Sequence, residues 1–276
     1  MERKTALRWK WVAITVSCCI AMLLLGCSIF ARKLLYFPTH VPLEQATFMA
    51  ARMGFKPWRD EDGDVIGWKK QAGANSKLPR ILITHGNGGC AVFRINYLDN
   101  LQKVEACDVY ILEYPGYGAR SGSPTQTSFF SAADGAFGLL EKQQGGRIYI
   151  VGESLGTGVA SYLAGAHPDA IAGVLLIAPY HNLTDVAQYH FRVLPAKWLL
   201  PDKFESAEHL RTYHGPLGIV VGGRDTVVPE KFGRQLYECY SGPKKLWEIP
   251  SAAHNDLPTE PVEWWRELVR FWNQPK

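Results

Sequence analysis

The chain has 276 residues, 47% of them hydrophobic, and a formal net charge of +4. Basic residues at the N-terminus account for this charge, so the rest of the chain is close to neutral; they are Arg3, Lys4, Arg8 and Lys10. The remainder has no basic stripe interleaved with aromatic residues and no C-x-x-C or H-E-x-x-H pair, so neither nucleic acid nor a metal ion is an expected partner.

An uncharged, apolar stretch runs from Trp11 to Ala31. At about 1.5 Å per residue it is long enough to cross roughly 30 Å of hydrocarbon as an N-terminal anchor whose amino end lies in the cytoplasm. Alternatively it is a cleaved signal, because Leu24-Leu25-Gly26-Cys27 resembles a bacterial lipobox and makes Cys27 a candidate for lipidation. Either interpretation predicts a membrane-associated protein whose main domain lies outside the cytoplasm. We assign residues 1–33 to this segment and 34–276 to one domain.

Apolar runs and amphipathic stretches alternate along the rest of the chain. This alternation predicts an α/β fold with a mostly parallel central sheet and helices on both faces. The expected strands are 64–69, 80–84, 108–113, 147–152, 172–178, 216–222 and 245–249. The expected helices are 92–103, 126–141, 155–166, 229–240 and 259–272, the last with a buried stripe of Trp265, Leu268, Val269 and Trp272.

A glycine-rich loop, His85-Gly86-Asn87-Gly88-Gly89, follows the strand expected at 80–84. Its glycines allow the chain to turn so that backbone amides face inward, where they can bind an anion. A phosphate is one candidate, but the loop lacks the G-x-x-x-x-G-K-[ST] spacing of a P-loop. An oxyanion formed during acyl transfer is the other, and we assign its donors to the amides of Asn87 and Leu155.

The sequence Gly152-Glu153-Ser154-Leu155-Gly156 stands between an expected strand and a small-residue helix. A sharp turn at this place exposes a serine hydroxyl to a base and puts it beside backbone donors, and it needs small flanking residues. This context makes Ser154 the candidate nucleophile.

A base and an orienting acid should follow the nucleophile in the order Ser, Asp or Glu, His. Asp225 comes after the strand expected at 216–222, and His254 lies between the last strand and the last helix. We therefore predict Asp225 as the acid and His254 as the base. Asp256 is so near His254 in the sequence that it is only a second choice as the acid. The interval from Tyr180 to Tyr213 has no expected strand, and its apolar segment Leu194–Pro201 predicts either a short cap over the site or a segment that packs on the body of the domain.

Taken together, these motifs resemble the α/β-hydrolase superfamily from about Tyr36 to the C-terminus. The matching segments, in order, are H-G-N-G-G, E-Y-P-G-Y-G at 113–118, G-E-S-L-G, G-G-R-D-x-x-V-P at 222–229 and A-H-N-D-L at 253–257. They are similar to a branch with little lid that includes membrane-associated, serine-aminopeptidase-like hydrolases and acyl-protein thioesterases. The resemblance implies a Ser154–Asp225–His254 triad and a structural role for E-Y-P-G-Y-G. Relatives often have Ala where this chain has Gly88, which implies a looser loop here.

The sequence predicts a membrane-tethered serine hydrolase of carboxylic ester or thioester acyl substrates that works without a cofactor. An aminopeptidase-like amidase is one alternative, although no clear acidic pocket for a substrate amine is visible. A non-catalytic binding protein on the same fold is another. Three cysteines lie in the main domain, an odd number that implies no complete disulfide framework; they are Cys90, Cys107 and Cys239.

Overall fold

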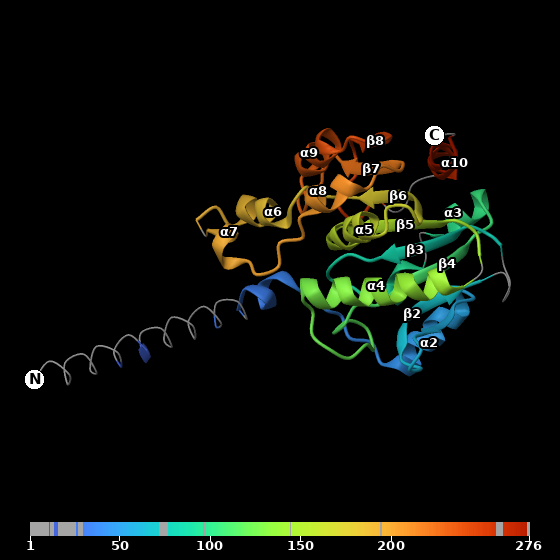
Figure 1. Ribbon diagram of the computed structural model, residues 1–276, viewed down its shortest axis with the longest axis horizontal. Helices are drawn as coiled ribbons and strands as arrows, with labels where there is room; N and C mark the ends of the chain where they lie inside the picture. The colour runs from blue at the N-terminus through green and yellow to red at the C-terminus, as the bar shows by residue number, and fades with distance from the viewer. Residues whose placement is uncertain are drawn as a thin grey trace, which may run out of the picture.

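The computed structural model describes residues 11, 14–15, 26, 30–71, 77–95, 98–143, 145–193, 195–257 and 262–274. Its centre is an eight-stranded sheet in the order β1-β2-β4-β3-β5-β6-β7-β8 (Figure 1). The strands are β1 (Lys56–Arg59), β2 (Val65–Lys70), β3 (Arg80–Thr84), β4 (Asp108–Leu112), β5 (Ile148–Glu153), β6 (Ile171–Ile177), β7 (Leu217–Gly222) and β8 (Lys244–Ile249). Strands β1 and β2 pair antiparallel, as do β2 and β4, and all later pairs are parallel.

Helices cover both faces of the sheet. They are α2 (Leu43–Arg52), α3 (Leu98–Val104), α4 (Gln126–Lys142), α5 (Leu155–Ala166), α6 (Leu183–His190), α7 (Ala196–Leu199), α8 (Ser206–His209), α9 (Glu230–Cys239) and α10 (Val262–Trp272), with short 3-10 turns η1 (Ala91–Arg94) and η2 (Leu210–Thr212). Buried side chains of α4, α5 and α9 belong to one apolar core, and those of α2, α3 and α10 to a second.

Alternate side chains of a strand belong to different cores, which shows that the two cores lie on opposite faces of the sheet. In β3, Leu82 packs in the first core, whereas Ile81 and Ile83 pack in the second. Successive side chains of a strand point to opposite faces, so this pattern fixes the sidedness of the helices. All residues of β3 are buried, because both faces are covered. A strand buried in this way reads as a continuous apolar run, which is why the sequence predicts it.

The predicted elements agree with the observed ones except at α2, β1 and η1–α3, and between β6 and β7, where the prediction has no α6, α7, α8 or η2. Helix α2 and strand β1 are absent from the prediction, because α2 buries only Ala46 and Ala50 and β1 buries only Trp58. The helix expected at 92–103 is instead the turn η1 followed by α3. In the last helix, Trp265 and Leu268 are fully buried, as the predicted stripe requires.

The residues just after the predicted membrane segment pack on the domain. Residues 30–35 are helical, so the predicted boundary between 33 and 34 falls inside a helix. Arg32 Nε lies 2.9 Å from the buried Asp202 Oδ2, which follows the cap. The hydrogen bond to this carboxylate raises the pKa of Arg32. Tyr36 is buried against Phe129, with ring centroids 5.3 Å apart. The residues from Arg32 to Tyr36 are therefore part of the folded unit.

Cys90, Cys107 and Cys239 are all free thiols. Burial raises the pKa of Cys90 and of Cys107 to about 12, so these two thiols stay protonated and unreactive near neutral pH.

Candidate active site

Ser154 occupies a strained turn between β5 and α5. Its φ of 50° and ψ of −119° are rare for a residue with a side chain, and such a backbone costs on the order of 1–3 kcal/mol unless its surroundings hold it in place. Close packing supplies that support. A Cβ at Gly156 would lie 2.1 Å from the carbonyl oxygen of Thr84, and one at Gly152 would lie 2.7 Å from Ala160 Cβ. Gly156 thus lets the turn sit against β3, Gly152 lets α5 pack on β5, and Ser154 is held at the carboxyl edge of the sheet.

His254 joins Ser154 to Asp225. Its Nε2 lies 2.9 Å from Ser154 Oγ, and its Nδ1 lies 2.7 Å from Asp225 Oδ2. Because an ionised carboxylate can only accept, Nδ1 is the donor to Asp225, and Nε2 is left as an acceptor for the serine hydroxyl. The structure therefore places the three predicted residues in one hydrogen-bonded chain, in the geometry that a nucleophile, a base and an orienting acid require.

The carboxylate of Asp225 is held by its own loop. Its Oδ1 accepts hydrogen bonds from the amides of Val227 and Val228, both at 2.8 Å, and its side chain is fully buried. The candidate alternative, Asp256, instead accepts a bond from the amide of Ala253 at 2.9 Å. Asp225 is thus the carboxylate that contacts the His254 ring, whereas Asp256 bonds within the loop that carries this histidine.

The loops after β7 and β8 are aligned backbone to backbone. Gly223 donates to the carbonyl of Ile249 and Arg224 to that of Ala252, both at 3.0 Å. A Cβ at Gly222 would lie 2.6 Å from the same Ala252 oxygen. The glycines of G-G-R-D are therefore needed for close packing, because they let the loop that carries Asp225 approach the loop that carries His254.

The glycine-rich loop after β3 lies against the nucleophile. A Cβ at Gly86 would be 3.3 Å from Ser154 Cβ, so the loop passes directly beside the turn that carries Ser154. Within the described part of the chain, the amides of Asn87 and Leu155 donate to no other protein group. Both amides are thus available to a ligand, as the predicted oxyanion role requires.

The side chain of Asn87 anchors this loop, a role that sequence reasoning missed. Its Oδ1 accepts from the amide of Phe37 at 2.9 Å and from the hydroxyl of Tyr117 at 2.7 Å. Its Nδ2 donates to the carbonyl of Leu35 at 2.5 Å. The loop is therefore tied to the helical residues that follow the predicted membrane segment. Only the asparagine within H-G-N-G-G hints at this contact in the sequence.

The E-Y-P-G-Y-G segment holds the glycine-rich loop in place through side-chain contacts. Tyr114 donates to the carbonyl of His85 at 3.0 Å, and burial raises the pKa of this tyrosine, so its hydroxyl stays protonated as a donor. Glu113 accepts from the amide of Ala91 and lies 3.2 Å from His85 Nε2. The segment has the structural role that the sequence predicts, and it acts by holding the glycine-rich loop.

A second buried carboxylate lies next to the nucleophile. Glu153 Oε2 is 2.6 Å from Arg94 Nε, which comes from the turn η1 after the glycine-rich loop. This ion pair connects the end of β5, next to Ser154, to the turn η1 that follows the glycine-rich loop. Because each buried carboxylate near the site is engaged in this way, neither Glu113 nor Glu153 offers a free anion to a substrate amine.

Comparison with known proteins identifies the family. A family model described as "alpha/beta hydrolase fold" matches residues 79–211. The uncharacterized protein MT2364 of Mycobacterium tuberculosis is 30% identical over 229 residues, which cover 82% of this chain and 80% of that protein. The chain belongs to the α/β-hydrolase family. The predicted family and fold class are thereby confirmed.

Other relatives of this α/β hydrolase include proteins named for lipid hydrolysis. Lysophosphatidylserine lipase ABHD12 of Danio rerio is 30% identical over 211 residues, which cover 68% of this chain and about half, 54%, of that protein. An esterase from Pyrococcus furiosus shares the fold, with a TM-score of 0.64 at 18% identity, covering 86% of this chain and 96% of that one. Together with the family match, these relatives support a hydrolase.

One relative, from yeast, is named as a membrane protein. The protein YNL320W of Saccharomyces cerevisiae, called an uncharacterized membrane protein, is 29% identical over 197 residues, 69% of each chain. Among the residues described for this α/β hydrolase, no helix has the length and apolar character to cross a membrane. Most of the predicted span Trp11–Ala31, and Cys27 with it, lies outside the described residues, so anchor and lipidation stay predictions.

An apolar cavity of about 210 Å³ lies between residues 30–35 and the helices α6 and α7 with the residues that adjoin them, which we call the cap. It is lined by Phe30, Ala31, Leu34 and Leu35 on one side and by Ala187, Phe191, Ala196, Leu199 and Leu200 on the other. The carbonyl of Leu35 is the one that binds Asn87, so the cavity adjoins the glycine-rich loop. Residues on both sides of the predicted boundary between 33 and 34 and residues of the predicted cap segment thus line one cavity.

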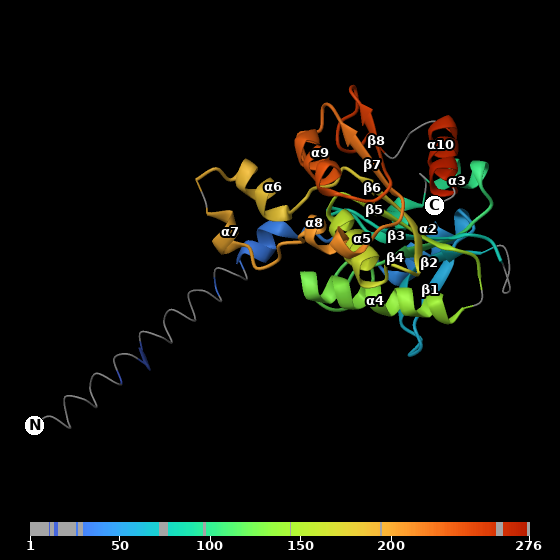
Figure 2. The ribbon, with the colours of Figure 1, turned by 45° about the horizontal axis from the view of Figure 1, so that its top comes forward.

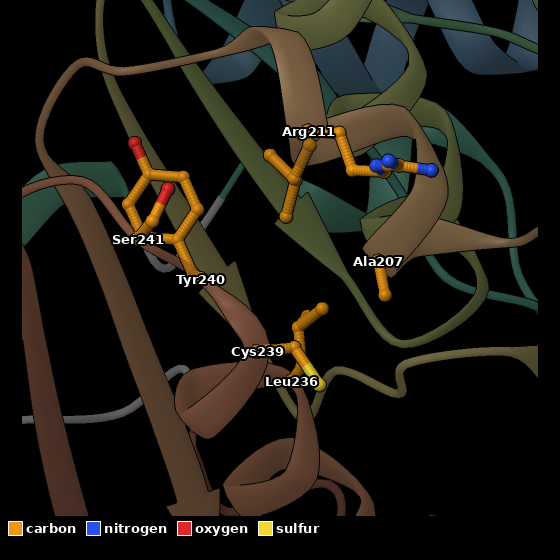
Figure 3. A pocket seen from close by; sticks show the side chains of 7 residues that line it. Ala207, Arg211, Leu236, Cys239, Tyr240 and Ser241 are labelled. Carbon is orange, nitrogen blue, oxygen red and sulfur yellow. The ribbon is translucent and has the colours of Figure 1, made fainter.

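A separate pocket of about 240 Å³ lies beside α8, η2 and α9 (Figure 3). Its lining residues are Ala207, Leu210, Arg211, Leu236, Cys239, Tyr240 and Ser241. Arg211 faces this pocket but pairs with Glu208 at 3.1 Å. No candidate catalytic residue lines this pocket, so it is not part of the candidate site.

Proposed function

We propose that this α/β hydrolase is a serine hydrolase that cleaves carboxylic ester or thioester bonds of acyl substrates at a membrane surface. The observation that carries the proposal is the continuous hydrogen-bonded chain from Ser154 Oγ through His254 to the buried Asp225. A binding protein would have no need of a strained serine, a base, an oriented acid and two unpaired amides in one place.

The mechanism follows from this geometry. Ser154 Oγ attacks the acyl carbon while His254 Nε2 takes the hydroxyl proton, and the negative charge on the substrate oxygen is stabilised by the amides of Asn87 and Leu155. The imidazolium then gives its proton to the departing alkoxide or thiolate, which leaves an acyl-enzyme. Water attacks this ester with His254 again as base, and collapse of the second intermediate releases the acid and restores the serine hydroxyl. The Asp225 carboxylate holds the imidazole in place and stabilises the imidazolium through its hydrogen bond to Nδ1.

An ester or thioester fits the site better than a peptide with a free amino terminus. An aminopeptidase-like amidase would need an unpaired carboxylate for the substrate amine, whereas Glu113, Glu153 and Asp225 are all engaged. The apolar cavity between the cap and residues 30–35 instead offers a place for an acyl chain.

Chain length is therefore expected to control the rate. Each methylene buried in the cavity is worth up to about 0.8 kcal/mol, so kcat/KM should rise by as much as about fourfold per added methylene from acetyl to medium-length p-nitrophenyl esters, until the cavity is full. Matched acyl thioesters and aminoacyl p-nitroanilides complete the panel. Faster turnover of an anilide than of every ester and thioester would refute the proposed substrate class.

Replacing Asn87 with alanine is expected to lower kcat by about tenfold or more. The backbone amide remains, but its loop loses the bonds to Leu35, Phe37 and Tyr117, so the amide is less well placed for the oxyanion. Steady-state kinetics on a short soluble ester measure the effect, and KM should change little.

Thr125→Ala is the control for this loss, because it removes a helix cap on α4 worth about 1 kcal/mol and lies outside the candidate site. It should lower the melting temperature and leave kcat unchanged. If Asn87→Ala keeps kcat within about twofold of wild type, the side chain does not position the loop.

A further inference from the structure

The cap carries exposed apolar side chains that do not line the apolar cavity. Trp198 on α7 is 85% exposed, and Val193, just before it, is 94% exposed. Neither side chain lines the cavity between the cap and residues 30–35. Phe30 and Phe191 are also exposed by half or more, although they line part of that cavity. We call these four residues, Phe30, Phe191, Val193 and Trp198, the cap surface.

We propose that the cap surface docks on the lipid bilayer and turns the candidate active site toward it. The proposal rests on the proposed function, because it describes how that site would meet a substrate dissolved in a membrane. It goes further in assigning a second membrane contact, made by the folded domain and separate from the N-terminal segment.

The location of the cap surface supports this choice of partner. Figures 1 and 2 both place α6 and α7 beside the first described residues of the domain, on the side away from α2. The uncharged stretch Trp11–Ala31 ends at this point, since Phe30 lines the same cavity as α7. A bilayer that held this stretch would therefore lie next to the cap.

The charge of the two adjoining segments fits an anionic lipid surface. No Asp or Glu stands between Glu2 and Glu44, or between Asp185 and Asp202. These segments contain the exposed basic residues Lys33, Arg192 and Lys197. Lys197 directly precedes Trp198 on α7, and a basic residue beside an exposed tryptophan is typical of a helix that lies in the interface of a bilayer.

The cap surface also lies at the functional edge of the sheet. Helix α6 follows β6, and its His190 lies 2.8 Å from the carbonyl of Val227, in the loop that holds Asp225. Because the carboxyl ends of the parallel strands share one edge, Ser154, His254 and the cap are on the same side of the domain. Docking through the cap would thus present the site and its apolar cavity to lipid.

The test uses the full chain reconstituted in phosphatidylcholine vesicles with and without phosphatidylglycerol. Trp198→Glu and Val193→Glu are compared with Phe48→Glu on α2, a control that also places a charge at a large exposed apolar residue, 66% exposed, away from the cap. Hydrolysis is measured for a long-chain ester dissolved in the bilayer and for a short soluble ester.

The two cap variants should lose about tenfold or more of the activity toward the bilayer ester and keep the activity toward the soluble ester within about twofold. Phe48→Glu should change neither. Wild-type activity toward the bilayer ester should be higher with phosphatidylglycerol and should fall with added salt. Equal activity of all variants toward the bilayer ester would overturn the proposal. An equal loss on both substrates would overturn it too, because the cap would then act on the site itself.

Quenching of tryptophan fluorescence by brominated lipids is an independent readout. The quenched fraction should be smaller for Trp198→Phe than for wild type if Trp198 enters the bilayer, and an equal fraction would count against docking. If the wild type hydrolyses no ester at all, the proposed function fails, while this measurement still decides the docking. If the cap surface instead joins two copies of the chain, Trp198→Glu will dissociate a cross-linkable dimer without changing the quenched fraction, and the bilayer is then the wrong partner.

Discussion

Ser154→Ala is expected to reduce ester hydrolysis by about 10⁵-fold or more, to a level near the background. Without Oγ no acyl-enzyme can form, and in a group of residues that act as a unit the loss of the nucleophile removes nearly all of the chemical acceleration. The same variant should not react with a fluorophosphonate, which labels wild type covalently at this serine. Labelling is measured in a gel with a fluorescent probe, and hydrolysis with a short soluble ester.

Fold and chemistry can be separated at this position. The substitution removes one oxygen and its hydrogen bond to His254, and it leaves the glycines that accommodate the turn in place. The lost bond is worth about 1 kcal/mol, so the melting temperature should fall by no more than a few degrees. Fluorophosphonate labelling of the alanine variant at the wild-type rate would show that another residue is the nucleophile.

Most of the sheet could be predicted from the sequence because its inner strands are buried on both faces. Strands β3, β4 and β5 read as unbroken apolar runs, and each ends in turn residues that mark the carboxyl edge. The antiparallel edge strand β1 has only four residues, and three of them face solvent at least in part, so it gives no periodic signal. Helix α2 is similar, since only two alanines of its sequence are buried.

The candidate site likewise has residues whose positions could be predicted from the sequence and contacts that could not. The positions of Ser154, Asp225 and His254 could be predicted because each lies in the loop or turn that follows a strand, where the fold brings residues together whatever their separation in sequence. The contacts of Asn87 could not, because Leu35 and Phe37 precede it by about 50 residues and lie outside any strand. Their position depends on how the residues after the predicted membrane segment pack, and no local pattern in the sequence records that packing.

Asp225→Asn is expected to lower kcat by about 10⁴-fold, by analogy with the amidation of other triad acids. The amide is nearly the same size as the carboxylate, and its oxygen can still accept from the amides of Val227 and Val228. Its NH₂ group then faces His254 Nδ1 and donates to it. The histidine is left with its proton on Nε2, where it cannot accept the proton of Ser154.

Asp256→Asn is the matched control, since it makes the same chemical change two residues from the base. Asp256 binds the amide of Ala253, and an asparagine oxygen can accept the same bond. We expect a loss of less than tenfold in kcat for this variant, measured on the same soluble ester, with both variants folded by circular dichroism. The opposite ranking, with Asp256→Asn the more damaging, would mean that Asp256 orients His254 during catalysis and that the 2.7 Å contact with Asp225 serves the loop alone.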